Sequence, residues 1–114
     1  MKIYLFIIVL LVIIYNLWTQ SNETCKIYWF HKPGCPACKS MANEWKLVED
    51  ALRSSSIKTM RIDISNPKYN KMTINFNIES VPCIVKVFPE GTRCVYTGDR
   101  KCNNIVEWAY ELSY

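Results

Sequence analysis

Two cysteines separated by two residues, Cys35 and Cys38, lie between a strand-like segment and a helix-like segment, and this arrangement limits the possible folds more than any other feature. Residues 25–30 (CKIYWF) have the aromatic and β-branched composition that favours a strand. Pro36 falls where the first turn of a helix tolerates proline. Apolar residues then recur at helical spacing: Met41, Trp45, Val48 and Leu52. We therefore expect both cysteines at the N-terminal end of a helix that directly follows a strand.

The rest of the chain continues to alternate between strand and helix patterns. Residues 57–62 favour a second strand, and Asn66-Pro67 opens a second helix. Two further strands, 81–88 and 92–97, are joined by a turn, and a last helix covers 104–112. The order βαβαββα predicts an α/β domain with a four-stranded mixed sheet and helices on both faces. Its first two strands should be parallel and its last two antiparallel.

The N-terminal segment has a different character, since no charged residue occurs between Ile3 and Asn22. This length approaches the ~20 apolar residues that span a bilayer. A cleaved secretory signal is the alternative, although bulky Trp18 and Gln20 stand where a cleavage site needs small residues. We therefore predict that a transmembrane helix precedes the α/β domain and contacts the membrane through residues 3–18. The predicted organisation has three parts: a transmembrane signal-anchor at 1–18, a polar stalk at 19–24 and a folded domain at 25–114.

Charge and cysteine content predict where this domain lies. Lys2 precedes the apolar segment, whereas Glu23 and Lys26 behind it nearly cancel, so the positive-inside rule favours a cytosolic N-terminus. Six cysteines in 114 residues agree with an oxidising compartment. We thus predict a single-pass membrane protein whose domain faces a lumenal, periplasmic or exterior compartment. The formal net charge is +4, with basic residues scattered among acidic ones, so we predict no nucleic-acid partner.

The chemistry expected of the cysteine pair follows from its place at a helix start. A thiol attacks only as the thiolate, and the free N–H groups and dipole of a helix N-terminus favour an anion. Lys32 and Lys39 add positive charge nearby. Cys35 is then the expected nucleophile, and Cys38, one turn later on the same face, the resolving thiol of disulfide exchange. A structural disulfide and a zinc site are alternatives, although a zinc site usually needs a second ligand pair and His31 is the only histidine.

Several segments carry a family resemblance that extends beyond the cysteines. Residues 25–114 resemble a thioredoxin-fold domain, and the second half is most similar to a domain of protein disulfide isomerases. The matching segments are GCPACK after an aromatic strand, RIDISNP, VPCIVKVFPEG and YTGDRKCNNIVEW. The resemblance implies a minimal thioredoxin-like fold and a thiol–disulfide oxidoreductase that acts on protein thiols or disulfides. We predict no organic cofactor and no metal ion.

The same resemblance assigns roles to individual residues. Pro82 matches a proline that is cis in the family and lies against the dithiol. Arg100 matches an arginine that can approach the resolving cysteine and ease its deprotonation; a solvated charge before a helix is the alternative. The predicted catalytic residues are therefore Cys35, Cys38, Pro82 and Arg100. The predicted substrate-contacting residues are Gly34, Pro36, Val81, Pro82 and Cys83.

The chain also departs from the family pattern. Trp29 stands where thioredoxins and isomerases have a buried acid that helps to move the proton of the second thiol. Gly34 replaces an aromatic residue, which leaves the site more open. The family's N-terminal strand and helix are missing, as in glutaredoxins, whose Cys-Pro-x-Cys motif also resembles the segment from Cys35 to Cys38. A clear glutathione-binding pattern is absent, so the glutaredoxin-like reading ranks second.

The remaining cysteines are less clearly assigned. Cys83 follows Pro82 and is expected near the dithiol, as a second resolving thiol, as part of a Cys₃His metal set with His31, or as a small buried hydrophobe. Cys25 and Cys94 are expected at the end of the sheet away from the dithiol, and Cys102 at the active end. A structural disulfide among these three is possible, but spacing does not determine connectivity.

These observations predict a membrane-tethered protein thiol–disulfide oxidoreductase with Cys35 as nucleophile and Cys38 as resolving thiol. It would oxidise, isomerise or reduce protein disulfides, with a direction that depends on redox potential and compartment. Two alternatives remain open. The domain is a non-catalytic thioredoxin-fold interaction module with a vestigial dithiol, or it carries a glutaredoxin-like or metal-binding cysteine site.

Overall fold

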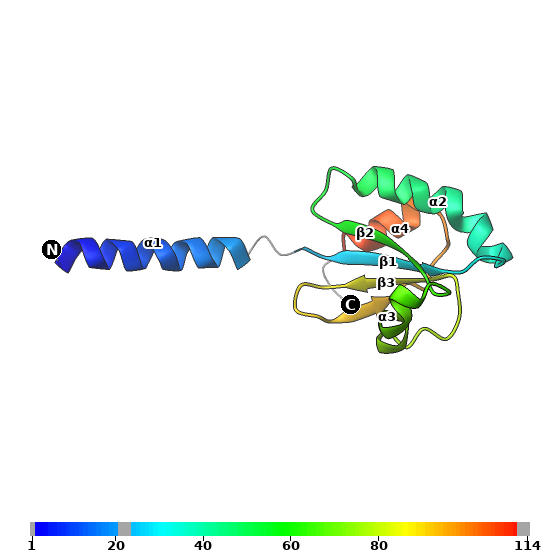
Figure 1. Ribbon diagram of the computed structural model, residues 1–114. Helices are drawn as coiled ribbons and strands as arrows, with labels where there is room; N and C mark the ends of the chain where they lie inside the picture. The colour runs from blue at the N-terminus through cyan, green and yellow to red at the C-terminus, as the bar shows by residue number, and fades with distance from the viewer. Residues whose placement is uncertain (1, 21–23, 112–114) are drawn as a thin grey trace.

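The computed structural model describes residues 2–20 and 24–111, apart from the side chains of residues 17–20. Its domain contains four strands, β1 (Lys26–His31), β2 (Lys58–Asp63), β3 (Cys83–Val87) and β4 (Arg93–Val95). The helices of the domain are α2 (Pro36–Leu52), the 3₁₀ helix η1 (Pro67–Tyr69), α3 (Asn70–Asn75) and α4 (Cys102–Ala109). Figure 1 shows α2 and α4 on one side of the sheet and α3 on the other.

The four strands form one mixed sheet in the order β2-β1-β3-β4. Strand β1 pairs with β2 in parallel, with His31 opposite Asp63, and with β3 in antiparallel, with Phe30 opposite Cys83. The short strand β4 completes the sheet by antiparallel pairing with β3. Because β1 is central and leads directly into α2, the end of β1 delivers the residues of the cysteine motif to one edge of the sheet.

Each face of the sheet has its own apolar core. Ile27 and Trp29 of β1 and Ile84 of β3 pack against the buried stripe of α2 and against Ile105 of α4. On the other face, buried residues of three strands pack against the segment that contains α3: Phe30, Ile62 and Val85. The alternation of side chains along a strand explains this division, since neighbouring residues point to opposite faces.

Lys86 is a charged exception within the first core, and its side chain is completely buried. Its Nζ donates hydrogen bonds to the carbonyl oxygens of Trp108, at 2.7 Å, and Glu111, at 3.0 Å. The rings of Phe88 and Trp108 flank the ammonium group, with centroids 4.9 and 4.8 Å away. Lys86 therefore fastens the end of α4 to the centre of the sheet.

The predicted element order of the domain is confirmed, with small differences at the boundaries. The second helix is divided into η1 and α3, and η1 starts with Asn66 as its N-cap, as the Asn-Pro pair predicted. The last helix starts at Cys102, earlier than predicted, and its predicted end at residue 112 lies outside the described residues. The proposed domain limits of 25–114 remain a prediction.

The prediction for the N-terminal segment is corrected. Helix α1 (Lys2–Gln20) stands apart from the sheet and its helices (Figure 1), and its apolar side chains from Ile3 to Tyr15 are exposed. Within residues 2–20 and 24–111, no helix combines the length and apolar character that a membrane crossing needs. The unbroken apolar run extends from Ile3 to Ile14, and it is therefore shorter than the ~20 residues that span a bilayer. The predicted location as a single-pass membrane protein, with the orientation derived from it, is therefore wrong. A membrane contact through residues 3–18 is not shown, and the limits of 1–18 and 19–24 for the N-terminal parts remain a prediction.

Candidate functional site

The reactive end of the molecule is built where β1 turns into α2. Gly34 has φ +78°, a conformation that glycine adopts without strain. Cys35 follows as the N-cap of α2, and Pro36 occupies the first helical turn, where its missing N–H group leaves no hydrogen bond unmade. The backbone N–H of Cys38 donates a hydrogen bond to Cys35 Sγ over 3.2 Å. The predicted placement of both cysteines at the helix start is thus observed.

The surroundings of Cys35 favour its thiolate. A hydrogen bond from the Cys38 thiol is the largest influence and lowers the pKa of Cys35, which burial partly opposes. The backbone N–H groups of Cys38 and Ala37 and the charge of Lys32 lower this pKa further. All of these groups belong to the turn before α2 or to its first turn. Cys35 is therefore the stronger nucleophile of the pair.

Cys38 has the opposite character. Its side chain is only 4% exposed, and this burial, together with its hydrogen bond to Cys35, raises the pKa of the Cys38 thiol. Smaller influences act in the other direction: a backbone hydrogen bond at Lys32 and the positive charge of Arg100 lower this pKa. At neutral pH, Cys38 thus keeps its proton while Cys35 is prone to lose its own.

The backbone at Val81 and Pro82, which is distant in the sequence, lies against the Cys35 sulfur. Cys35 Sγ is 3.9 Å from the carbonyl oxygen of Val81, and the Val81–Pro82 peptide bond is cis. The structure therefore brings Val81 and Pro82 to Cys35, although 46 positions separate Val81 from Cys35 in the sequence. Arg100 lines a small cavity together with Pro82, and its positive charge acts on Cys38.

A groove of about 720 Å³ opens beside the two cysteines. Aromatic, proline and alanine side chains line it together with basic side chains, which add positive charge. The lining comprises Trp29, His31, Lys32, Pro33, Gly34, Cys35, Pro36, Cys38, Lys39, Ala42 and Arg61. Gly34 and Pro36, whose contact with substrate remains a prediction, line this groove, and none of its described lining residues carries a carboxylate.

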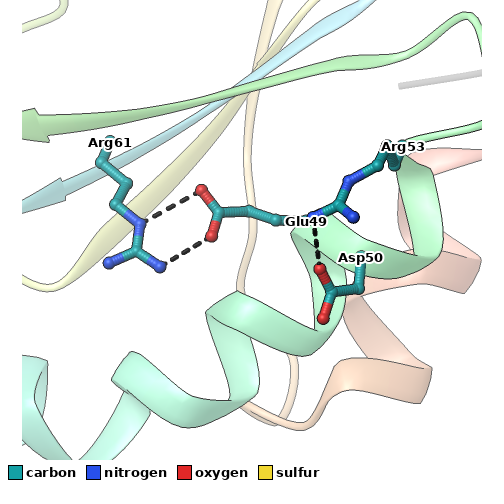
Figure 2. A network of polar contacts seen from close by, with 4 residues as sticks. All are labelled: Glu49, Asp50, Arg53 and Arg61. Atoms are coloured by element: carbon teal, nitrogen blue, oxygen red, sulfur yellow. Dashed lines mark hydrogen bonds and ion pairs between the residues drawn. The ribbon is translucent and has the colours of Figure 1, made fainter.

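Trp29 occupies the position that the family resemblance reserves for an acid. It is 3% exposed, and its ring centroid lies 4.5 Å from that of His31 and 5.7 Å from that of Trp45. The guanidinium of Arg61 lies 5.7 Å from the Trp29 ring, and Figure 2 shows it held by two contacts with Glu49, at 2.7 and 3.1 Å. The indole therefore gives the groove an aromatic wall but no group that can accept a proton from Cys38.

Cys83 packs as a partly buried hydrophobe, which is one of the three expectations for it, and the alternation of β3 determines its face of the sheet. Ile84 packs with Cys38 in the core on the α2 side, whereas Cys83 packs with Phe30 and Val85 on the opposite face. Burial raises the pKa of the Cys83 thiol, which makes it a poor thiolate. Cys83 therefore lies on the face of the sheet opposite to Cys38. Among the described residues, no cluster of three or more potential ligands could hold a metal ion.

The other cysteines lie in the predicted regions as free thiols. Cys25 precedes β1, and Cys94 pairs with Lys86 towards the same end of the sheet, away from the dithiol. Cys102 starts α4, and its backbone N–H donates a hydrogen bond to Glu44 of α2 over 2.7 Å. Sequence reasoning missed this contact and the Arg61–Glu49 pair, because each joins elements whose distance no spacing rule gives.

Comparison with known proteins agrees with this geometry. The thioredoxin family model matches residues 15–111, so the predicted thioredoxin-like fold is confirmed. Protein disulfide isomerase-like 5-3 of Oryza sativa subsp. japonica is 28% identical over 78 residues, which make up 68% of this chain. The chain spans only 18% of the length of that relative.

Two solved structures share the fold at lower identity. The first two thioredoxin domains of Naumovozyma dairenensis Eps1p superpose with a TM-score of 0.68 and 23% identity, over 79% of this chain and 36% of that chain. The first thioredoxin domain of mouse protein disulfide-isomerase A4 gives a TM-score of 0.67 and 22% identity, over 78% of this chain and 63% of that chain. At these identities, the likeness shows the arrangement of the elements.

Proposed function

Since this chain belongs to the thioredoxin family, we propose that its Cys35–Cys38 pair exchanges electrons with disulfides and thiols of protein substrates. The observation that carries the proposal is the opposite character of the two thiols, with a lowered pKa for Cys35 and a raised pKa for Cys38. In a dithiol of this kind, the thiolate of one cysteine attacks the substrate disulfide, and the other cysteine stays protonated until it resolves the mixed disulfide.

In the reducing direction, the Cys35 thiolate attacks one sulfur of a substrate disulfide. A bond forms between Cys35 Sγ and that sulfur, the substrate S–S bond breaks, and the second substrate sulfur leaves as a thiolate. The half-exposed position of Cys35 beside an open groove gives a protein substrate access to this sulfur. Buried Cys38 is shielded from the same attack.

In the second step, Cys38 loses its proton to water and attacks Cys35 Sγ. The Cys35–Cys38 disulfide forms, the mixed disulfide breaks, and the first substrate sulfur leaves as a thiolate. The substrate has then gained two electrons and the enzyme has lost two, and the reverse sequence oxidises a substrate dithiol. Arg100 favours the Cys38 thiolate through its charge, which supports its assignment to this step.

The substrate chain contacts the surface on both sides of Cys35. The Val81 carbonyl oxygen, 3.9 Å from Cys35 Sγ, can accept a hydrogen bond from a substrate backbone N–H group once the thiol is engaged. Gly34 and Pro36 leave the opposite side open to the groove. Pro82 contributes by holding the Val81 carbonyl group at the cysteine, and Cys83 is not included because it packs on the other face of the sheet.

Trapping tests this proposal. A Cys38→Ser variant should accumulate mixed disulfides through Cys35 when incubated with a protein disulfide substrate, because the second step is blocked. Cys35→Ser should accumulate none and should lose activity in an insulin-reduction assay. Full activity of Cys35→Ser would contradict the proposal.

A non-catalytic interaction module is the second candidate, and the indole of Trp29 in place of an acid is the observation that favours it. The same trapping experiment separates the two candidates. A module that only binds partners gives no mixed disulfide in the Cys38→Ser variant, and its binding is unchanged by Cys35→Ser.

A further inference from the structure

The N-terminal end of α4 is capped from another helix. The first N–H groups of a helix have no partner within that helix, and a negative charge near them is stabilising. The N-cap residue Lys101 provides no side-chain hydrogen bond. Instead, Oε2 of Glu44, on α2, accepts a hydrogen bond from the N–H of Cys102 over 2.7 Å. A contact between residues 58 positions apart thus fixes where α4 begins.

The segment before α4 is also held at its other end. The hydroxyl group of Tyr96 donates a hydrogen bond to the carbonyl oxygen of Asp99. Gly98 lies so close to this ring that an added Cβ atom would be 2.6 Å from the Tyr96 hydroxyl oxygen. The Tyr96 ring itself packs on Trp108 of α4, with 5.0 Å between the ring centroids. Arg100 is therefore attached between two fixed points, the Tyr96–Asp99 turn and the Glu44–Cys102 contact.

Helix α2 faces this segment across a cavity of about 590 Å³. The residues around the cavity come from the first turns of α2 and from the segment before α4: Ala37, Ser40, Met41, Glu44, Asp99, Arg100 and Lys101. Cys38 belongs to the same turns of α2 and packs with Met41 and Cys102 in the core. Met41, which lines the cavity, and Cys102, which Glu44 caps, thus connect the segment of Arg100 to the core around the resolving cysteine.

We propose that Glu44 is a positioning residue for the second step of disulfide exchange: by capping α4, it holds Arg100 within electrostatic range of Cys38. This inference rests on the proposed function, because a positioned Arg100 matters only if Cys38 acts as a resolving thiol. Arg100 then favours loss of the Cys38 proton although position 29 carries no acid. Glu44 itself does not touch the reacting sulfurs. It acts through the backbone of Cys102 and the side chain two positions earlier.

The sign of the effect separates positioning from a direct electrostatic action of Glu44. A carboxylate near Cys38 disfavours the thiolate, so removing Glu44 lowers the pKa of Cys38 if only its charge matters. Removing it raises this pKa if Glu44 matters because it holds Arg100. The other charged or titratable groups around Cys38 are of two kinds. Cys35, His31, Lys32, Lys39 and Arg61 lie on β1, β2, α2 or the turn before α2, away from the Glu44 contact, whereas Asp99, Lys101 and Cys102 belong to the Arg100 segment and the start of α4.

The experiment measures the pKa of the Cys38 thiol in the full chain. In a Cys35→Ala background, the rate of iodoacetamide alkylation at Cys38 is followed against pH by peptide mass spectrometry. Glu44→Ala should move the midpoint to higher pH, as Arg100→Ala does, and the two changes together should move it no further than Arg100→Ala alone. Glu44→Gln, which keeps a hydrogen-bond acceptor for the cap, should recover most of the original midpoint.

Asp50→Ala is the matched control, because it removes an acidic side chain from the same helix. Among the residues that the structure describes, the Asp50 carboxylate pairs with exposed Arg53 (Figure 2), so this variant should leave the Cys38 midpoint unchanged. In the Cys35-containing protein, Glu44→Ala should slow release of a preformed mixed disulfide by on the order of fivefold, the size expected from moving one solvent-screened charge. Circular dichroism establishes that each variant is folded.

Two results overturn the inference. The first is a Cys38 midpoint that falls or stays constant in Glu44→Ala, and the second is a further shift when Glu44→Ala is added to Arg100→Ala. Neither depends on catalytic activity, so the inference can fail while trapping through Cys35 succeeds. Conversely, absence of mixed disulfides in Cys38→Ser removes the proposed function and leaves the measured coupling between Glu44, Arg100 and Cys38 intact.

Discussion

Replacement of the buried Lys86 by methionine tests whether a fully buried charge stabilises this fold. The change removes two hydrogen bonds from an ammonium group, each contributing about 1.5–3 kcal/mol, and two contacts with aromatic rings. Methionine avoids the desolvation cost of the ammonium, which is several kcal/mol, and fills a similar volume. Because Glu111 is exposed, water can replace the lost partner at its carbonyl oxygen. We expect a net loss of about 2 kcal/mol in the free energy of unfolding.

Urea denaturation followed by far-ultraviolet circular dichroism, under reducing conditions, measures this loss. Lys86→Ala should cost about 3 kcal/mol more than Lys86→Met, since it also removes buried methylene groups worth about 0.8 kcal/mol each. Lys58→Met, at an exposed position of β2, is the control and should change the free energy of unfolding by less than about 0.5 kcal/mol. A Lys86→Met variant as stable as the original chain would refute the reasoning, because burial of the charge would then cost as much as its contacts contribute.

Three further predictions concern the reactive end. The lowered pKa of Cys35 predicts that its alkylation by iodoacetamide reaches a plateau at lower pH than that of Cys38, whose pKa is raised; equal pH profiles by peptide mass spectrometry would contradict the assignment of the nucleophile. Burial lowers the pKa of His31 below 6.5, so the unfolded chain binds the proton more readily and the free energy of unfolding should fall as pH drops through 6.5 towards the folded pKa; His31→Gln should flatten this dependence in urea titrations at several pH values. Gly98→Ala should cost about 1–3 kcal/mol in urea denaturation, because its Cβ atom meets the Tyr96 hydroxyl group, and Tyr96→Phe should not relieve the clash, since the ring carbons are also close.

The domain could be predicted closely from the sequence because its elements have clear periodicity. The stripe of α2, the Asn66-Pro67 start of η1 and the turn between β3 and β4 all lie where the pattern placed them. The face of the sheet on which Cys83 lies could not be predicted in the same way. The strand CIVKV is apolar on both faces except for Lys86, and Lys86 is buried too, so its pattern does not show which side chains face α2.

The N-terminal segment shows a different limit. The absence of charge between Ile3 and Asn22, over a length that approaches ~20 residues, favoured a span over residues 1–18. The length of the unbroken apolar run, which ends at Ile14, is the property that a bilayer tests. Among the described residues, no helix meets that requirement. Absence of charge was therefore a weaker predictor than continuous apolar length.

At the reactive site, the pKa of Cys35 is set by residues close to it in the sequence, whereas the pKa of Cys38 also depends on distant residues. The lowered pKa of Cys35 could therefore be predicted from the sequence, and the raised pKa of Cys38 could not. The influences that lower the pKa of Cys35 come from residues 32–38, which any strand–turn–helix junction of this sequence brings together. The raised pKa of Cys38 depends on burial beneath the sheet, and its main opposing charge comes from Arg100, 62 positions further on. Family resemblance suggested Arg100, but the contact that holds its segment, from Glu44 to Cys102, had no signal in the sequence. The indole at position 29 cannot accept the proton of Cys38, and the charge of Arg100 favours its loss. We therefore expect changes on the α4 side to alter the second step of exchange.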